Sequence, residues 1–108
     1  MMRYLLVASR DPFTARDVDG FYDLAGSLAE HGHAVTLFLV QNGVLPARRG
    51  PGAESLTRLA RSGVSVLAEE FALRERGITA DRLADGIERA SLDHVVDALA
   101  DGVRTLWT

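Results

Sequence analysis

The chain has 108 residues, of which 47% are apolar and 25% are charged, and its formal net charge is −3. This length and composition predict one soluble globular domain with a core of its own. All 12 basic residues are arginine and there is no cysteine, which excludes Schiff-base and phosphate-loop lysine chemistry, disulfides, thiolate nucleophiles and persulfide carriage.

The first elements predicted are a strand and a helix. The nearly continuous apolar run from Tyr4 to Ala8 indicates a strand buried on both faces. A loop with a proline follows, and Asp17 or Asp19 is expected to cap the next helix. Gly32 is expected to end that helix in the left-handed conformation. The apolar stripe of the helix is predicted to be Phe21, Leu24, Ala25, Leu28 and Ala29.

The middle of the chain repeats the pattern. Ala34 to Val40 is the strongest strand candidate, and the Gln41-Asn42-Gly43 turn ends it. The segment from Val44 to Gly52 contains two prolines and is expected to be irregular and mobile. A short helix from Glu54 to Ser62 comes next, ended by Gly63.

The last third predicts a strand, three short helices and a final strand. Val64 to Ala68 is the strand, and Glu69 to Arg76 forms the helix that Gly77 ends. Two further short helices are expected, with Thr79 and Ser91 as their caps. Their buried positions are predicted to be Leu83 and Ile87 on the first, and Leu92, Val95, Val96 and Leu99 on the second. Val103 to Trp107 completes the pattern as a strand.

Strands that alternate with helices predict an α/β fold. We expect a three-layer α/β/α sandwich with a mainly parallel sheet of four to five strands, built as a single domain over residues 1–108. No apolar run approaches the roughly 18 residues needed to cross a bilayer, and the first residues do not form a signal peptide. The protein is therefore expected to be cytoplasmic, with no membrane partner. Its mild acidity argues against binding to nucleic acid, which favours a basic face.

In an open parallel sheet, ligands bind beyond the carboxyl ends of the strands. Segments after the three predicted strands should meet there and form a candidate crevice. Its expected residues are Arg10, Asp11, Gln41, Asn42, Gly43, Arg48, Arg49 and Glu70. The two neighbouring arginines could grip a phosphate or a carboxylate, or they could belong to a solvated loop or a subunit contact.

The sequence contains no catalytic constellation and predicts no cofactor. The first strand–helix turn lacks the glycine pattern of a dinucleotide site. Glu69 and Glu70 begin a helix, where the helix dipole favours carboxylates without any catalysis. His31 and His33 flank Gly32 and lack a third ligand nearby, so no metal site is predicted.

Several motifs together resemble those of a known family. The strand that ends in Leu39-Val40 and continues into Gln41-Asn42-Gly43-Val44 is similar to a segment of the DsrE/DsrF/DsrH (Tus) sulfur-relay family. The Gly-Val-x-Val strand of residues 63–66 agrees with it, and so does the Leu73-Arg74-Glu75-Arg76-Gly77-Ile78 segment. The resemblance covers essentially the whole chain.

The resemblance implies an α/β/α subunit of a homo-oligomer, a trimer or hexamer, in the bacterial cytoplasm, with sulfur-relay proteins as possible partners. Relatives of the DsrE type carry a persulfide on a cysteine just after the third strand. Counted back from Arg76-Gly77, that cysteine position falls at Glu69, or at Ala68 one residue earlier. Because this chain has no thiol, the resemblance implies a member that cannot carry sulfur itself.

Three functions are consistent with these observations. The first is a non-catalytic, oligomeric DsrE-like subunit or partner protein in sulfur relay or sulfur oxidation. The second is a small-ligand or anion-binding module that uses the crevice. The third is an enzyme in which Glu69 or Glu70 replaces thiol chemistry with acid–base chemistry.

Overall fold

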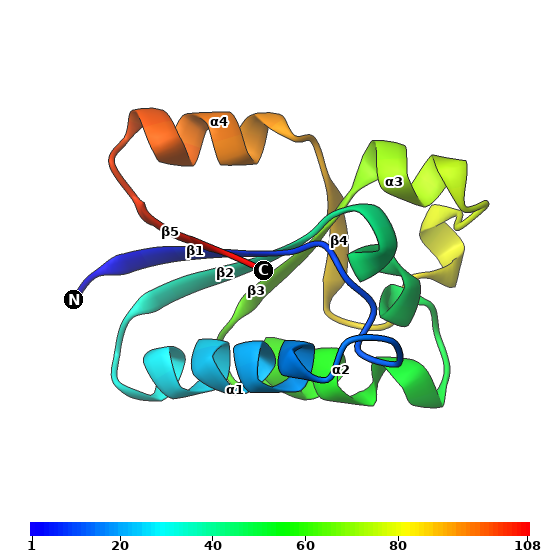
Figure 1. Cartoon of the computed structure of the whole chain (residues 1–108), viewed down its shortest axis with the longest axis horizontal. Coiled ribbons are helices and arrows are strands. Elements are labelled where there is room, and N and C mark those ends of the chain that lie inside the picture. Colours follow the sequence, from blue (N-terminus) through cyan, green and yellow to red (C-terminus); the bar gives the residue numbers. More distant parts are fainter.

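A parallel sheet of five strands in the order β4-β3-β2-β1-β5 runs through the middle of the molecule (Figure 1). The computed structural model describes all residues from 1 to 108. The strands are β1 (Arg3–Ala8), β2 (Ala34–Leu39), β3 (Ser65–Glu69), β4 (Ile87–Ala90) and β5 (Arg104–Trp107). All four strand pairs are parallel, so the predicted α/β fold with a parallel sheet is confirmed.

Helices lie on both faces of this sheet. The helices are α1 (Asp17–Glu30), α2 (Glu54–Arg61), α3 (Glu70–Glu75) and α4 (Asp93–Ala100), and the 3₁₀ turns are η1 (Gln41–Ala47), η2 (Pro51–Ala53) and η3 (Ala80–Arg82). Figure 1 shows α1 and α2 side by side under one face and α4 over the other. None of these helices combines the length and the apolar character needed to cross a bilayer.

The two faces of the sheet bury very different amounts of apolar surface. On the face that packs against α1 and α2, a cluster of 21 buried residues includes Leu6, Leu37 and Val66. On the face that packs against α4, the cluster has only 7 residues, among them Val7, Phe38 and Val95. Because hydrophobic stabilisation grows with buried apolar area, most of it comes from the α1–α2 side.

The predicted start and apolar stripe of α1 are partly wrong. Neither Asp17 nor Asp19 caps the helix, because no side chain makes a capping bond there and Asp17 already lies in the first turn. Asp17 instead pairs with Arg10, and that hydrogen bond holds its pKa below the usual range. Of the predicted stripe, Ala25 is buried, and Phe21, Leu28 and Ala29 are partly buried against the main core. Leu24 is exposed, and the spacing did not select Val18 and Tyr22, which are buried.

Residues 44–52, predicted to be irregular, are largely helical. They continue η1 and begin η2, and Val44, Pro46 and Ala47 are buried. The turn packs its apolar side against the main core, so the prolines are accommodated in tight 3₁₀ geometry. This compact segment forms one side of the hollow described below.

The helix predicted around Leu83 and Ile87 does not form: Leu83 follows the short 3₁₀ turn η3, and Ile87 begins a strand. Both side chains are buried as expected, but Ile87–Ala90 is β4, which pairs with β3 at the edge of the sheet. The stripe predicted on α4 is also mostly wrong. Val95 alone is buried there, while Leu92, Val96 and Leu99 are exposed.

Candidate functional site

Two hollows lie beside the carboxyl ends of the strands, where one crevice was predicted. The first, the Glu69 pocket, has a volume of about 410 Å³. The second, the arginine groove, has a volume of about 650 Å³. The Glu69 pocket is lined by Val40, Gln41, Glu69, Phe71, Ala72, Glu75, Leu92 and Trp107. The arginine groove is lined by Asp11, Phe13, Leu45, Pro46, Arg48, Arg49, Gly50, Pro51, Gly52, Asp81 and Arg82.

Glu69 is the last residue of β3 and the N-cap of α3. Its Oε2 accepts a hydrogen bond of 2.5 Å from the backbone N–H of Phe71, and its Oε1 accepts one of 3.0 Å from that of Ala72. The residue is 8% exposed, the only charged residue in the buried set. The carboxylate therefore satisfies backbone donors that the helix start would otherwise leave unpaired. Both of its oxygens are engaged, which disfavours Glu69 as an acid–base group.

The Gln41-Asn42-Gly43 segment holds η1 against the ends of the strands. Gln41 has a φ of +48°, the only non-glycine residue in the left-handed region, and it lines the Glu69 pocket. The Oδ1 of Asn42 accepts two hydrogen bonds from the Arg76 guanidinium, at 3.3 and 2.9 Å. Gly43 packs on the backbone of Ala8. Asn42 and Gly43 thus have structural partners and line neither hollow.

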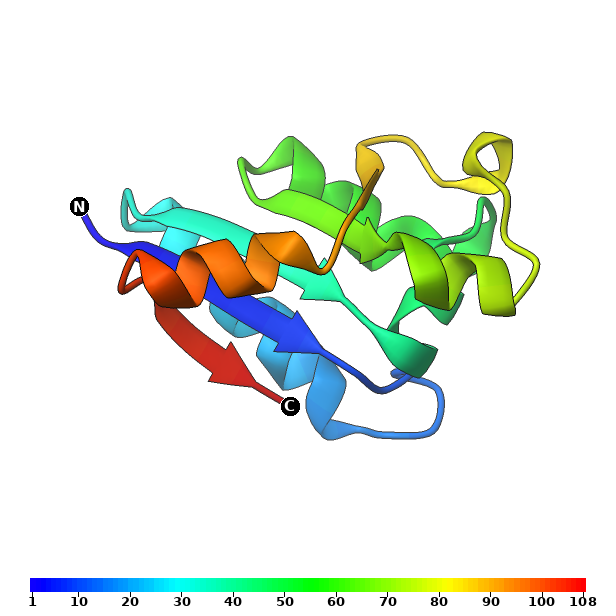
Figure 2. The ribbon, with the colours of Figure 1, turned by 90° about the horizontal axis from the view of Figure 1, so that it is seen from above.

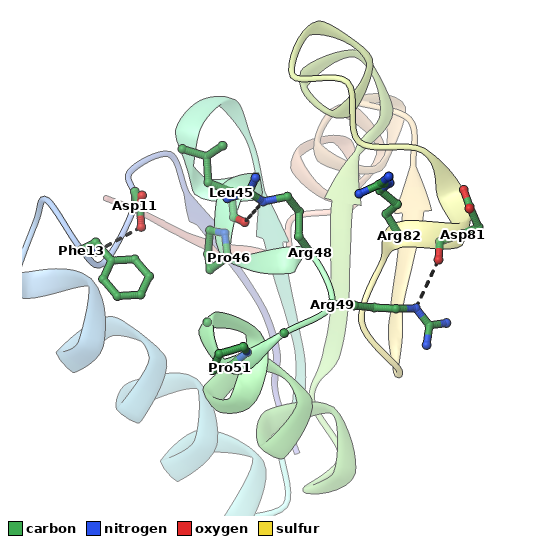
Figure 3. Close-up of a pocket in the computed structure, with 11 residues that line it drawn as sticks. Asp11, Phe13, Leu45, Pro46, Arg48, Arg49, Pro51, Asp81 and Arg82 are labelled. Carbon is green, nitrogen blue, oxygen red and sulfur yellow. Dashed lines mark hydrogen bonds between the residues drawn. The ribbon is translucent and has the colours of Figure 1, made fainter.

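The arginine groove is lined by three segments: the loop after β1, the η1–η2 segment, and η3. Arg48 forms an antiparallel bridge with Leu83, and hydrogen bonds from Arg49 N to Arg82 O (2.8 Å) and from Ala84 N to Ala47 O (2.9 Å) flank it. This short ribbon places three arginines in one groove. Figure 3 shows Phe13 and Arg82 at opposite sides of this group of residues, with Pro46, Pro51 and Arg48 between them.

The three arginines of the groove differ in their partners. The Nε of Arg49 donates to the carbonyl of Asp81 at 3.2 Å, and its Nη1 lies 3.6 Å from Oδ1 of Asp85. The Nε of Arg48 donates to the carbonyl of Leu45 at 3.3 Å. Neither Arg48 nor Arg82 makes an ion pair.

The remaining crevice residues are placed as follows. Asp11 lines the arginine groove, and its Oδ1 accepts a hydrogen bond of 3.1 Å from the backbone of Phe13. Arg10 lines neither hollow, because it pairs with Asp17 and donates to Oγ1 of Thr108 at 2.7 Å. Glu70 is partly buried in the first turn of α3 and also lines neither hollow. The predicted residues are thus divided between two sites and a structural frame.

Sequence reasoning missed four residues that shape these hollows. Phe13 and Arg82 belong to the arginine groove, and Phe71 and Trp107 belong to the Glu69 pocket. Phe13 could have been suspected from the sequence, because it is an aromatic residue in the proline-containing loop after the first predicted strand. Arg82 gave no such signal, because only the bridge to residue 48 brings it near the groove.

The histidines have structural partners. His31 Nδ1 lies 2.7 Å from the carbonyl oxygen of Ser27, and His33 Nδ1 accepts a hydrogen bond of 3.0 Å from the backbone of Met2. His33 also meets the edge of the Tyr4 ring, at a centroid distance of 5.3 Å. Nowhere in the structure do three or more metal-binding side chains gather into a group that could hold an ion.

Comparison with known proteins identifies relatives of the whole chain. The model of the DsrE/DsrF-like family matches residues 2–108. No curated protein sequence matches the chain.

Three solved structures share the fold. The ychN protein of E. coli superposes with a TM-score of 0.90 at 23% identity, over 100% of both chains. MTH1491 of Methanobacterium thermoautotrophicum, described as a protein of unknown function, gives 0.87 at 19% identity, also over 100% of both chains. BT1422 of Bacteroides thetaiotaomicron, likewise of unknown function, gives 0.80 at 15%, over 97% of this chain and 94% of the other. At these identities the likeness concerns the fold alone.

Proposed function

The chain belongs to the DsrE/DsrF-like family, and this relates it to sulfur-relay proteins. From this premise we propose that it is a subunit that works without thiol chemistry. In this proposal it assembles with copies of itself in the cytoplasm. It serves sulfur relay or sulfur oxidation as a non-catalytic partner protein. The reaction steps belong to other proteins that carry cysteine.

One observation carries the proposal. The chain contains no cysteine, and Glu69, which the resemblance matches to the sulfur-carrying cysteine, is bonded to the backbone as a helix cap. A carboxylate at this position brings a negative charge of its own. A second anion such as a persulfide would be repelled there at short range. In this proposal the position that carries sulfur in relatives is occupied by a residue with a structural role.

The exposed apolar residues on the α4 side support self-association. Leu92, Val96 and Leu99 follow helical spacing on α4, and Val96 is 60% exposed. Trp107 is 61% exposed and lines the Glu69 pocket with Leu92. Figure 2 looks onto this side of the sheet, with α4 lying over the strands. Aromatic and aliphatic residues of this kind are typical of the centres of protein interfaces.

Light scattering after gel filtration at micromolar concentration tests the proposal. A mass of three or six times the 11.7 kDa of one chain is expected, and Val96→Glu should lower it. Leu24→Glu is the matched control, because it charges an exposed leucine on α1, across the sheet. A monomer at every concentration would contradict the proposal, as would a Val96→Glu protein that assembles like the wild type.

A second candidate function has its own observation. The arginine groove contains two guanidinium groups without ion pairs, which favours a module that binds a small anionic ligand. Thermal unfolding with added anions separates the two candidates. A ligand at a hundred times its Kd stabilises the folded state by about 2.7 kcal/mol.

A further inference from the structure

We propose that the arginine groove binds a small phosphorylated molecule that carries a flat ring, of which a nucleoside monophosphate is the simplest example. The inference rests on the second candidate function and gives it a ligand class. It is independent of whether the chain assembles, because the α4 surface and the groove share no residue.

The charge of the groove favours an anion. Arg48 and Arg82 make no ion pair, and the terminal nitrogens of Arg48 form no bond within the protein. Guanidinium groups donate in a planar fork that matches two oxygens of a phosphate. Arg49 is already paired with Asp85, so the positive charge that favours an anion is that of Arg48 and Arg82.

The two aspartates are engaged by neutral donors. Oδ1 of Asp11 accepts the N–H of Phe13, and Oδ1 of Asp81 accepts the Thr79 hydroxyl at 2.5 Å. The Thr79 bond is the largest cause of a lowered pKa at Asp81, and the charges of Arg82 and Arg49 lower it further. Neither carboxylate forms an ion pair with Arg48 or Arg82. Both guanidinium groups are therefore available to a ligand.

The backbone fixes the anion-binding groups in place. The bridge between Arg48 and Leu83 and its flanking hydrogen bonds clamp the two arginine segments together. Arg49 donates to the carbonyl of Asp81, a hydrogen bond drawn in Figure 3, and also pairs with the Asp85 carboxylate. Ordering the arginine backbones before a ligand arrives lowers the entropy that binding must overcome.

The other side of the groove suits a flat ring. Phe13 is 79% exposed, so most of its aromatic ring is open to solvent. One edge of the ring lies beside Gly52, because a Cβ there would stand 3.6 Å from Cε2 of Phe13, an ordinary van der Waals distance. Pro51 adds further apolar surface to the lining. A nucleobase can stack on such a ring whatever its identity, because every base has a flat π-face.

The size of the groove agrees with this ligand class. Its volume of about 650 Å³ lies within the range of roughly 300–1,000 Å³ that is typical of small-molecule sites. A ligand with only a phosphate would leave Phe13 unused, and one with only a ring would leave the arginines unused. A phosphate joined to a ring engages both sides.

Calorimetric titration of the full chain with AMP, adenosine and inorganic phosphate tests the inference. AMP should bind more tightly than either adenosine or phosphate. Arg82→Gln should weaken AMP about tenfold, the loss expected for one charged hydrogen-bond partner. Phe13→Ala should weaken AMP and leave phosphate unchanged. Arg104→Gln on β5, at the far edge of the sheet, is the matched control and should bind like the wild type.

Three outcomes would overturn the inference. They are no heat of binding with millimolar AMP, equal affinity for AMP and adenosine, and unchanged AMP affinity in Arg82→Gln. Equal affinity for AMP and inorganic phosphate would show that the groove does not bind a ring, although it would still agree with an anion-binding module. Light scattering on the same samples reports assembly separately, so failure of the ligand and failure of the subunit proposal are distinguishable.

Discussion

Gly43 lies directly against the main chain of Ala8: a Cβ placed on Gly43 would stand 2.1 Å from the Ala8 carbonyl oxygen. The same oxygen accepts the hydrogen bond of Val40 N at 3.0 Å, and Gly43 N donates to Val40 O at 2.8 Å. The start of η1 is therefore in contact with the end of β1 through backbone atoms. Any side chain at residue 43 must separate the two.

Gly43→Ala is expected to destabilise the fold by about 2 kcal/mol or more, because the clash is with backbone that cannot rotate away. Urea unfolding measures the loss. Gly20→Ala is the matched control: nothing lies within 4 Å of a Cβ there, and the site is in the interior of α1. Since alanine favours helix, the control should gain about 0.5–1 kcal/mol. Equal stabilities of the two variants would contradict the packing described here.

Glu69→Ala is expected to cost about 1–2 kcal/mol, because it removes the cap of α3 and leaves the N–H groups of Phe71 and Ala72 without partners. Chemical denaturation is the measurement. Glu75→Ala is the control, since Glu75 is an exposed residue at the other end of α3. If both variants lose the same stability, the loss reflects helix composition and the cap contributes nothing.

Glu69→Cys tests whether residue 69 occupies the position of the family's cysteine. The thiolate would meet the N–H groups that the carboxylate binds now, so the thiol pKa is expected below the ordinary value of about 8.5. The rate of alkylation as a function of pH measures it. Glu70→Cys, one residue further on, is the control. An inert thiol at residue 69, or one with an ordinary pKa, would mean that the position is assigned wrongly.

Tyr22→Phe is expected to leave stability unchanged or to raise it by about 1 kcal/mol. The hydroxyl of Tyr22 is the one buried side-chain polar atom without a hydrogen-bond partner, so its removal relieves an unmet desolvation cost. A loss of more than about 1 kcal/mol would show that the hydroxyl has a partner after all.

Tyr22 also predicts a pH dependence. Burial raises its pKa above the ordinary value of 10.0, and the charges of Asp11 and Asp19 raise it further. The folded state therefore keeps the proton where the unfolded state loses it. The stability that this group contributes is complete below pH 10 and declines as the pH rises above it. Tyr22→Phe should show a shallower decline in alkaline urea titrations, and parallel curves would contradict the shift.

Much of the fold could be predicted because its signals are local. The apolar runs of β1, β2 and β3 and the glycines that end the helices are visible in short windows, and Gly32, Gly63 and Gly77 all adopt positive φ. The strand β4 was missed because it is four residues long and carries Glu88 and Arg89 in its centre. Charges of this kind suit an edge strand, but they carry no periodicity.

The candidate site was less predictable because it depends on contacts between distant segments. The topology rule placed Gln41 and Glu69 at the same edge of the sheet, and they share a pocket. The rule says nothing of Arg82, which reaches the groove only through the bridge between Arg48 and Leu83. For the same reason, the helical spacing of apolar residues in α4 predicted a buried stripe but could not show that Val95 is its only buried member.

The unequal cores on the two faces of the sheet have a consequence for motion. The α4 side, with 7 buried residues against 21, has the smaller share of burial to hold it closed. Segments of that kind open locally at a lower free energy than the rest of a domain. Amide hydrogens of α4 should therefore exchange with solvent sooner than those of α1. If copies of the chain cover Leu92, Val96 and Leu99, this local opening is suppressed. Association would then also slow the hydrogen exchange of the α4 side.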